Sequence, residues 1–315
     1  MIVTEFYDGQ GLGNQIWCYA VTRSISKKKG LEYGIMSPHR FKGQEFLEID
    51  LGNLVVGGEG PEGGPPTSLP EEINLYYREF ISSHPSNGVN VSKKDPLMLE
   101  IEDQTKIDGC MQSLDYFDSK EEVKGWIKTQ EGKEIEEFSN RNTCVIHIRG
   151  GDFMGSTSIL SESYYKKAIE VMKGENPSMD FVIVTDDVGY SNRILPEYRI
   201  VGGSSSGHSD GKKASHHIGG PVWMDWSIIK NSEYLIISAS SFSFWPAFLN
   251  NKSKKIIAPM YWGDHRRSDG YWSCWDMIVD GWFYLDRENN LLPSLECKKN
   301  REEYESRNSN FLWKK

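Results

Sequence analysis

Short apolar runs alternate with helix-like segments through the second half of this chain, and no other feature limits its possible folds as strongly. Residues 144–148 form an apolar run typical of a buried strand, residues 164–173 have helical spacing, and residues 181–184 form the next run. The alternation continues with predicted strands at 199–201, 234–238 and 255–257 and predicted helices at 223–230 and 242–249. Strands that alternate with helices predict a parallel sheet of the α/β class.

The first residues show the same pattern once, around a glycine-rich turn. Residues 2–7 are typical of a strand, and residues 14–29 carry apolar side chains at helical spacing. The turn at 9–13 (GQGLG) lacks the spacing of the dinucleotide-binding fingerprint. Such a turn lets backbone N–H groups approach an anion at the start of the helix. The alternative is an ordinary tight turn without a ligand.

The length of 315 residues suits two domains. A charged stretch at 119–138 is expected to form one or two exposed helices, and a boundary is expected near 135–142. The predicted division is an N-terminal α/β domain at 1–138, a second α/β domain at 139–290 and a charged, helical C-terminal extension at 291–315. A chain of this size is not limited in the core that it can bury.

The overall charge and the distribution of apolar residues exclude several classes of protein. The net charge of −9 argues against nucleic-acid binding, which needs clustered basic residues, but it allows a local positive site for a small anion. No apolar run approaches the roughly 20 residues that span a bilayer, so no transmembrane segment is expected. The first residues do not resemble a secretory signal, and the five cysteines include no CxxC pair. We therefore expect a cytoplasmic protein with reduced thiols.

Polar side chains follow the apolar run at 144–148. His147 and Arg149 alternate onto one face where the strand ends, and Asp152 comes shortly after. A guanidinium at the carboxyl end of a parallel strand is placed to bind a phosphate through two parallel hydrogen bonds. The alternative is a structural ion pair between Arg149 and Asp152 beside a buried histidine.

Two further polar clusters follow later strands. Asp186 and Asp187 come directly after the second predicted strand of this half and suit a divalent metal, a ribose or base, or the cap of the next helix. The serine-rich stretch 238–245 runs from a strand end into a helix, where free N–H groups and hydroxyls suit a diphosphate. Its alternative is an ordinary helix cap.

Asp225 lies on the predicted helix 223–230, after a loop rich in glycine, serine and histidine. One carboxylate accepts two hydrogen bonds from the adjacent N–H groups of guanine, a pair that uracil does not offer. The alternative is an exposed carboxylate on a helix. The loop histidines His208, His216 and His217 match no strong metal-binding spacing.

Four segments in this order resemble the motifs of one enzyme family. They are 11–15 (GLGNQ), 109–117 (GCMQSLDYF), 147–152 (HIRGGD) and the stretch 225–262, which includes SASSFSFW at 238–245. In turn they resemble the patterns G-x-GNQ, G-Y-x-QS-x-x-YF, H-x-RR-G-D and D…SxSSFSWW…AP…W. The chain thus resembles the α-1,2-fucosyltransferase family, of the glycosyltransferase family 11 type, and its relatives, the α-1,6- and protein O-fucosyltransferases.

This resemblance implies a GT-B-like α/β fold in which two Rossmann-like domains face a cleft. Residues 139–290 would form the donor domain and residues 1–138 the acceptor side. The implied reaction is inverting and needs no cofactor and no obligatory metal. It moves L-fucose from GDP-fucose to a hydroxyl of an acceptor glycan, in an α-1,2 linkage to galactose. The implied partners are therefore a GDP-sugar and an oligosaccharide or glycoconjugate.

The resemblance also assigns roles to individual residues. Arg149 would bind the β-phosphate, and Asn14 would face the reacting centre. His147 and Asp225 would hold the guanosine, and Asp152 is a candidate base beside Asp8 and Glu162. The implied donor-binding set is Gly13, His147, Arg149, Asp186, Asp225, Ser240, Ser241 and Phe242, and the implied catalytic set is Arg149, Asn14 and Asp152.

The sequence departs from the family pattern at Gly150, where a second arginine is usual. One cationic contact to the donor is therefore missing, which leaves the donor sugar open and makes Arg23 and Arg266 candidates to replace it. Two other functions stay open from the residues alone. One is a metal-dependent GT-A enzyme that uses Asp186 and Asp187, and the other is a non-catalytic carbohydrate-binding protein.

Overall fold

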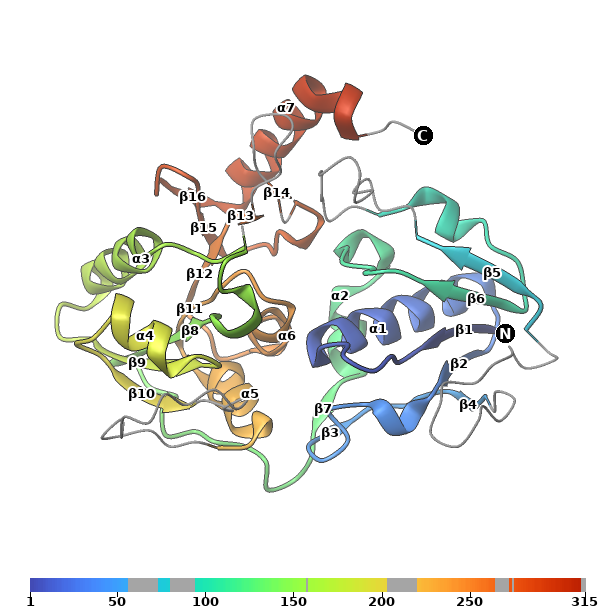
Figure 1. The fold of residues 1–315 in the computed structure, drawn as a ribbon, viewed down its shortest axis with the longest axis horizontal. Helices are drawn as coiled ribbons and strands as arrows, with labels where there is room; N and C mark the ends of the chain where they lie inside the picture. Colours follow the sequence, from blue (N-terminus) through green and yellow to red (C-terminus); the bar gives the residue numbers. More distant parts are fainter. Residues whose placement is uncertain are drawn as a thin grey trace. The chain divides into compact units, whose positions relative to one another are not determined.

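The computed structural model describes residues 1–55, 73–79, 94–156, 158–202, 220–263, 272–273 and 275–312. They form two compact units, one from the described residues of 1–128 and one from those of 129–315 (Figure 1). The division falls at Lys128, ahead of the boundary expected near 135–142. Each unit combines helices with a sheet whose strands are mainly parallel, which confirms the α/β class predicted from the sequence.

The sheet of the first unit has the strand order β4-β2-β1-β6-β5, and all of its neighbouring strands run parallel. The strands are β1 (Ile2–Glu5), β2 (Tyr33–Met36), β4 (Asn53–Leu54), β5 (Leu75–Arg78) and β6 (Thr105–Asp108). Helix α1 (Leu12–Lys29) connects β1 to β2. Because β2 and β4 lie on one side of β1, and β6 and β5 on the other, the strand order reverses between β1 and β6.

Helix α1 starts at the glycine-rich turn and packs into the core of the first unit. Trp17 stacks on Phe117 with ring centroids 5.9 Å apart. The helix ends at Gly30, whose φ of 65° is left-handed and lets its N–H bond the carbonyl of Lys27. The predicted helix at 14–29 is therefore confirmed, with a start two residues earlier, at Leu12.

The charged stretch at 119–138 contains one helix, within the predicted one or two, but it is helical only at its beginning. Helix α2 (Lys120–Gly125) starts after Ser119, and the chain continues as the short strand β7 (Lys128–Thr129) without a further helix before residue 138. Gly132 has a φ of 78°, a left-handed conformation that a helix does not contain. Other short elements of the first unit are η1 (Pro38–Arg40), β3 (Leu47–Glu48), η2 (Pro96–Leu99) and η3 (Leu114–Tyr116).

The sheet of the second unit has the order β10-β9-β8-β11-β12-β15-β16, parallel except for the final antiparallel pair β15 and β16. The strands are β8 (Thr143–Ile148), β9 (Asp180–Thr185), β10 (Arg199–Gly202), β11 (Tyr234–Ile236), β12 (Lys255–Pro259), β15 (Phe283–Leu285) and β16 (Leu291–Pro293). From β8 the chain first adds β9 and β10 on one side and then β11 and β12 on the other. The strand order therefore reverses between β8 and β11.

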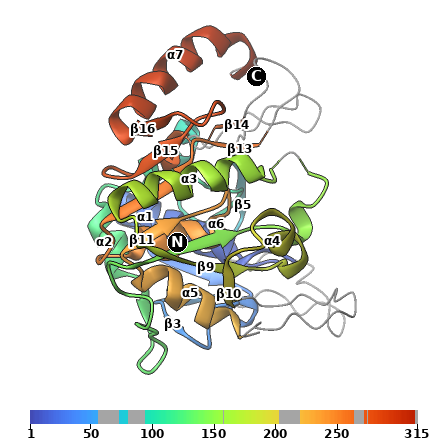
Figure 2. The same ribbon diagram turned by 90° about the vertical axis from the view of Figure 1, so that its left-hand side faces the viewer.

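Helices cover both faces of this second sheet (Figure 2). Helices α3 (Glu162–Glu175) and α4 (Val188–Ile194) pack on one face, and α5 (Val222–Asn231) and α6 (Ser241–Leu249) lie on the other. Successive side chains of β8 point to opposite faces of the sheet, and so toward different helices. Ile146 and Ile148 join the core under α3, whereas His147 lies against Phe242 of α6.

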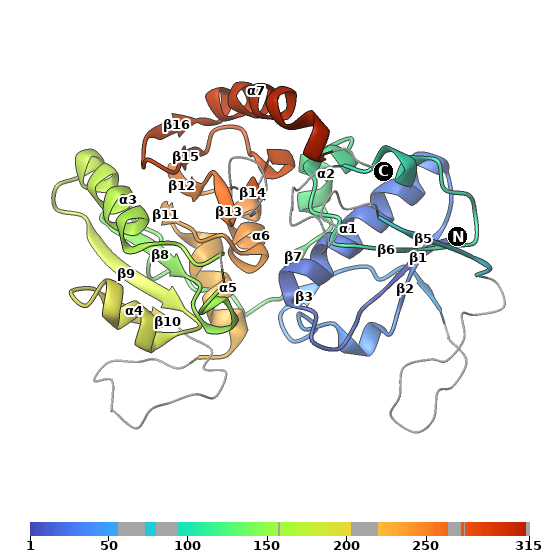
Figure 3. The same ribbon diagram turned by 45° about the horizontal axis from the view of Figure 1, so that its top comes forward.

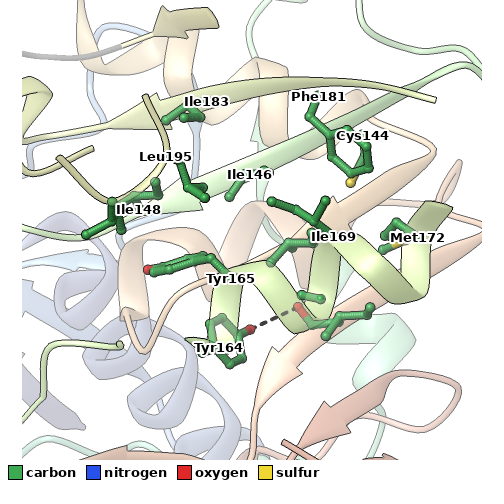
Figure 4. Close-up of a cluster of buried hydrophobic side chains, with 14 of the residues drawn as sticks. Cys144, Ile146, Ile148, Tyr164, Tyr165, Ile169, Met172, Phe181, Ile183 and Leu195 are labelled. Carbon is green, nitrogen blue, oxygen red and sulfur yellow. Dashed lines mark hydrogen bonds between the residues drawn. The ribbon is translucent and has the colours of Figure 1, made fainter. Parts of the chain in front are cut away.

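The core between the sheet and α3 fixes the edge of the sheet where the polar residues stand. Ile146, Ile183 and Tyr165 are fully buried in it (Figure 4). Each aliphatic side chain buried in this way contributes about 1.5–3 kcal/mol relative to an exposed one. Tyr164 of α3 donates its hydroxyl to the carbonyl of Ile237 at 2.7 Å, which holds the segment just after β11 in place.

The chain closes with helix α7 (Ser294–Leu312), which lies beside β15 and β16 (Figure 3). Shorter elements of the second unit are η4 (Gly151–Phe153), β13 (Tyr261–Gly263), β14 (Trp272–Ser273) and η5 (Trp275–Met277). The cysteines in the described ranges are Cys18, Cys110, Cys144 and Cys297, and all four are free thiols; Cys274 lies outside those ranges. Among the helices described, each is too short or too polar to cross a bilayer.

Candidate functional site

Most of the predicted site residues of the second unit lie around the point where its strand order reverses. Arg149 and Gly150 directly follow β8, and Ser238 and Ser240 follow β11, the neighbouring strand. A hydrogen bond of 2.7 Å between His147 Nδ1 and Ser238 Oγ joins the two strand ends. In open α/β sheets, the carboxyl edge at such a reversal is where ligands bind.

Arg149 is held between two carboxylates. One terminal nitrogen lies 2.9 Å from Asp186 Oδ2 and the other 2.6 Å from Asp152 Oδ1, while the guanidinium lies 5.3 Å from the ring centre of Phe153. The Arg149 side chain is 28% exposed, and Asp152 is 67% exposed. Within the described structure, its buried Nε has no hydrogen-bond partner. The guanidinium is thus fixed in orientation but remains accessible to an anion.

Asp186 ties the loop after β8 to the guanidinium. Its Oδ1 accepts a hydrogen bond from the N–H of Gly150 at 2.8 Å, while its Oδ2 faces Arg149. A Cβ on Gly151 would lie only 2.5 Å from Asp186 Oδ2, and Gly151 has a φ of 31°. Burial raises the pKa of Asp186, and the charge of Arg149 partly opposes that effect. Only a glycine at 151 lets the loop wrap this closely around the carboxylate.

Asp187 has a different task from Asp186. Its Oδ1 accepts the N–H of Tyr190 at 2.8 Å, so it caps α4, as the alternative interpretation of this pair predicted. A Cβ on Gly150 would lie 2.5 Å from the Cβ of Asp187. The second arginine of the family pattern therefore does not fit at position 150 unless the cap residue moves.

Of the two candidate replacements for that arginine, only Arg23 belongs to the described residues. Arg23 lies in the first unit, where it donates to Tyr19 Oη at 2.7 Å and stacks over the ring of Trp126 at 4.5 Å. These contacts give Arg23 a structural role on α1. Arg266 lies outside the described residues, as do His208, His216 and His217.

His147 is buried, with 2% of its surface exposed, and its ring centre lies 5.8 Å from that of Phe242. Burial, and secondarily the charge of Arg149, lowers the pKa of His147 from 6.5 to about 3. The imidazole is therefore neutral at physiological pH. The structure brings His147, Arg149 and Asp186 together, and it agrees with the buried-histidine alternative for this cluster.

The serine-rich stretch forms the start of α6. Ser240 caps the helix, since its Oγ accepts the N–H of Phe242 at 3.2 Å. Ser243 donates to the carbonyl of Ser240 at 3.2 Å, which closes the first turn. Ser241 and Phe242 are partly exposed at this end. The positive end of the α6 dipole thus stands at the same strand reversal as Arg149.

Asp225 is not an exposed helix residue, because only 3% of its surface is exposed. It projects from the first turns of α5 toward the end of β10, where a Cβ on Gly202 would lie 2.3 Å from Asp225 Oδ1. Since β9 separates β10 from β8 in the sheet, Asp225 stands at a different strand end from Arg149. The two groups could therefore serve different parts of one extended ligand.

In the first unit the structure brings two of the family-like segments together. Asn14 Oδ1 accepts a hydrogen bond of 3.0 Å from Gln112 Nε2, so the segments 11–15 and 109–117 meet at the start of α1. Gly13 is buried in the first turn of that helix. Asp8, a candidate base, is exposed and pairs with Arg40 at 3.2 Å.

Sequence reasoning missed Glu79, which organises the segment 109–117. Its carboxylate accepts the N–H of Met111 at 2.7 Å and the hydroxyl of Tyr116 at 2.8 Å. Burial raises the pKa of Glu79 to about 7. A single acidic residue at the end of a short polar strand carries no periodic pattern, so nothing in the sequence could have marked it.

Comparison with known proteins shows to which family this chain belongs. The family model described as "Glycosyl transferase family 11" matches residues 108–286, more than half of the chain. The chain belongs to glycosyl transferase family 11. It is therefore a glycosyltransferase, and the non-catalytic alternative is set aside. The matched residues include Arg149, Asp186 and the serine-rich start of α6.

Similar proteins include two from Escherichia coli. The alpha-1,2-colitosyltransferase is 24% identical over 282 residues, which cover 84% of this chain and 93% of that protein. The O-antigen biosynthesis glycosyltransferase WbnK is 26% identical over 133 residues, 39% of this chain and 40% of that protein. Among solved structures, NodZ alpha-1,6-fucosyltransferase soaked with GDP-fucose is 15% identical, with 82% of this chain and 94% of that chain covered at a TM-score of 0.45.

The burial of His147 predicts a specific acid sensitivity. An unfolded histidine titrates near 6.5, whereas His147 in the folded state titrates at about 3. The unfolded state therefore binds the extra proton as the pH falls through this window, and stability falls by up to about 1.4 kcal/mol per pH unit. In His147→Gln, the free energy of unfolding should fall less between pH 6.5 and 4. The exposed His39→Gln serves as the control, and equal slopes in all three proteins would contradict the prediction.

The contact between Gly151 and Asp186 predicts different effects at two glycines of the same loop. Gly151 and Gly155 both have positive φ, but a Cβ on Gly155 meets nothing within 4 Å. Gly155→Ala should therefore cost only the backbone strain, about 1 kcal/mol. Gly151→Ala should lower the unfolding free energy in urea by roughly 1–3 kcal/mol more, because the carboxylate must leave its partners. Equal losses would show that Asp186 moves aside without cost.

Proposed function

We propose that this glycosyltransferase moves L-fucose from GDP-fucose to a hydroxyl of an acceptor glycan, with inversion and in an α-1,2 linkage to galactose. The observation that carries the donor class is the placement of Arg149 beside the start of α6 at the strand reversal of the second unit. The name of the similar alpha-1,2-colitosyltransferase from Escherichia coli supports a deoxysugar donor and an α-1,2 linkage.

The charges at this edge suit a leaving nucleoside diphosphate. As the bond to the sugar breaks, negative charge grows on the β-phosphate, and fixed donors aimed at that charge are usually the largest contribution to catalysis. Arg149 supplies a guanidinium, and the first turn of α6 supplies N–H groups and the hydroxyl of Ser241. The exposed partner Asp152 holds its ion pair with Arg149 weakly, since exposed ion pairs contribute about 0–1 kcal/mol. A phosphate of the donor therefore replaces the Asp152 carboxylate as the partner of the Arg149 guanidinium.

The base of the donor is assigned to the buried groups farther along the edge. Asp225 accepts two N–H groups of guanine, and Asp186 is a further contact to the nucleoside. His147 remains in the donor-binding set as a neutral group that orients Ser238 and Phe242. Because the donor would span these strand ends, Ser240 and Phe242 lie along its diphosphate.

The acceptor hydroxyl attacks the face of the sugar opposite to the diphosphate, and its proton passes to a carboxylate. Asp152 is the proposed base; Glu162, which pairs with Lys166 at 2.5 Å, and Asp8 are the other candidates. Asn14, bonded to Gln112, is the proposed contact to the reacting centre from the first unit. We propose no metal in this step, since Asp187 is engaged in capping α4 rather than sharing a ligand with Asp186.

A second donor is favoured by one substitution and one relative. Gly150 removes a cationic contact that the family pattern supplies, and a similar protein that is matched over 84% of this chain is named as a colitosyltransferase. Colitose is therefore the alternative sugar for the same site. A panel of GDP-sugars with a panel of galactosides, with the products identified by mass spectrometry, distinguishes the two donors.

Arg149→Ala should lower turnover by roughly 10²–10³-fold, the usual loss for one donor to transition-state charge. Arg149→Lys should recover only part of this loss, because an ammonium cannot form the bidentate pair. The matched control is Arg193→Ala, which removes an exposed arginine of α4. Near-normal turnover in a folded Arg149→Ala variant would refute the phosphate role.

Turnover of the wild-type enzyme should also survive EDTA. Activity that is lost in EDTA but restored by Mn²⁺ would establish the metal-dependent alternative.

Nucleotide selectivity should depend on Asp225. At a hundredfold excess over Kd, GDP should stabilise the native state by about 2.7 kcal/mol and raise the melting temperature by a few degrees, whereas UDP should not. Asp225→Asn replaces one acceptor oxygen with an NH2 group that faces a guanine donor, at a cost of about 1–3 kcal/mol. The shift with GDP should shrink in that variant. Equal shifts with GDP and UDP would place the base elsewhere.

A further inference from the structure

The first unit has a strand reversal of its own, and polar side chains gather there as well. Strand β1 ends at Glu5 and its parallel neighbour β6 ends at Asp108, with β5 beyond β6 (Figure 1). Because the order reverses between β1 and β6, the carboxyl edge at this point is a favoured place for a ligand. Apart from Gly13, the donor assignment above involves the edge of the second unit's sheet, so this edge has no ligand assigned beyond Gly13 and the Asn14 contact.

Two tyrosines and a carboxylate form the central group at this edge, which we name the Tyr–Asp cluster: Tyr7, Tyr76 and Asp108. Tyr7 donates to Asp108 Oδ2 at 3.2 Å, and Tyr76 donates to the same oxygen at 3.0 Å. Among the described residues, nothing donates a side-chain hydrogen bond to Oδ1. Tyr76 is 54% exposed.

A buried ion pair supports the cluster from below. Lys106 Nζ bonds Glu5 Oε2 at 2.5 Å, both side chains are nearly buried, and the ammonium lies 5.3 Å from the ring centre of Tyr7. Ser37 donates to the other oxygen of Glu5 at 3.2 Å. Such a pair is costly to desolvate and adds little net stability. Its effect here is to fix the Tyr7 ring over a charge that cannot move away.

The same strand end also leads to the amide pair at the start of α1. Asp108 and Gln112 belong to one short turn, and Gln112 bonds Asn14 at 3.0 Å. Cys18 of α1 donates to the carbonyl of Gly109 within that turn at 3.6 Å. The turn is thus fastened to α1, and the Tyr–Asp cluster and the Asn14–Gln112 pair lie on consecutive parts of one rigid edge.

The chemistry of this edge selects one class of ligand. Asp108 would repel a phosphate or another anion, and Lys106 is engaged with Glu5. The exposed Arg78 lies opposite Asp108 in the register of β5 and β6 and adds N–H donors at this edge. A neutral ligand rich in hydroxyls finds a carboxylate oxygen that accepts hydrogen bonds, two phenolic hydroxyls, and the open face of Tyr76. Aromatic faces pack against the C–H face of a pyranose ring.

We propose that the Tyr–Asp cluster binds the acceptor saccharide, with Asp108 Oδ1 accepting hydroxyls of its terminal sugar and the Tyr76 ring packing against the sugar face. The identification of this ligand as the acceptor rests on the proposed function, whereas the saccharide site itself rests on the first unit alone. The cluster binds and positions the sugar and takes no part in proton transfer.

Steady-state kinetics with GDP-fucose and lactose test the site. Tyr76→Ala should raise the KM for lactose by roughly tenfold or more, and Asp108→Asn by a similar factor, the size expected for one lost hydrogen bond or ring contact. The KM for GDP-fucose and the melting shift with GDP should stay at wild-type values. Leu75→Ala is the matched control, since it removes another exposed side chain from the same strand.

A binding measurement without donor separates this proposal from the proposed function. Saturation-transfer NMR with methyl β-D-galactopyranoside and lactose should show contacts in the wild-type protein and in Leu75→Ala, and weak or absent contacts in Tyr76→Ala and Asp108→Asn. If the wild-type protein transfers no sugar from GDP-fucose yet shows this NMR pattern, the proposed function fails and the site stands. Wild-type contacts in both variants, an unchanged KM for lactose, or no contacts in the wild-type protein would overturn the site.

Discussion

The ion pair between Arg149 and Asp186 holds the candidate donor site together, because each partner depends on the other and both depend on the loop between them. Asp186 directly follows β9, and Arg149 directly follows β8, so the 2.9 Å contact joins two neighbouring strands at their carboxyl ends. Asp186 also accepts the N–H of Gly150, which bends the loop back toward the sheet. A partly buried carboxylate in contact with a guanidinium is worth more than an exposed pair, because water screens it less.

Strand order explains why polar residues collect at one edge of each unit. In both sheets the chain adds strands first to one side of a central strand and then to the other. The connections on the two sides of that strand run in opposite directions, which leaves a crevice at the carboxyl ends of the strands. In the second unit this crevice lies between β8 and β11, which the contact from His147 to Ser238 joins. In the first unit it lies between β1 and β6, where Tyr7 meets Asp108. The two edges carry different side chains, and we propose the cationic edge for a diphosphate and the carboxylate with aromatic rings for a neutral sugar.

The parts of the fold that could be predicted are those with strong periodicity. Helix α1, strands β8 to β12 and helices α3, α5 and α6 have clear apolar patterns, so their positions follow from spacing. The short strands β4, β5 and β6 were not predicted, since four residues such as TKID at 105–108 show no clear alternation of apolar and polar side chains. The charged stretch at 119–138 was predicted to form one or two exposed helices, and it forms one short helix, α2, because charge without an apolar stripe does not indicate a long helix that packs.

The sequence by itself determined the α/β class, the motif order and most of the residues at the second unit's carboxyl edge, since these depend on local spacing and on where strands end. Only the tertiary structure decided how those residues divide their tasks. Asp186 binds Arg149 while its neighbour Asp187 caps α4, and Asp225 is buried rather than exposed. It also decided that Tyr7, Tyr76 and Asp108 meet. Residues so far apart in the chain become neighbours only through strand order, and strand order comes from the packing of whole elements, which no local pattern of side chains encodes.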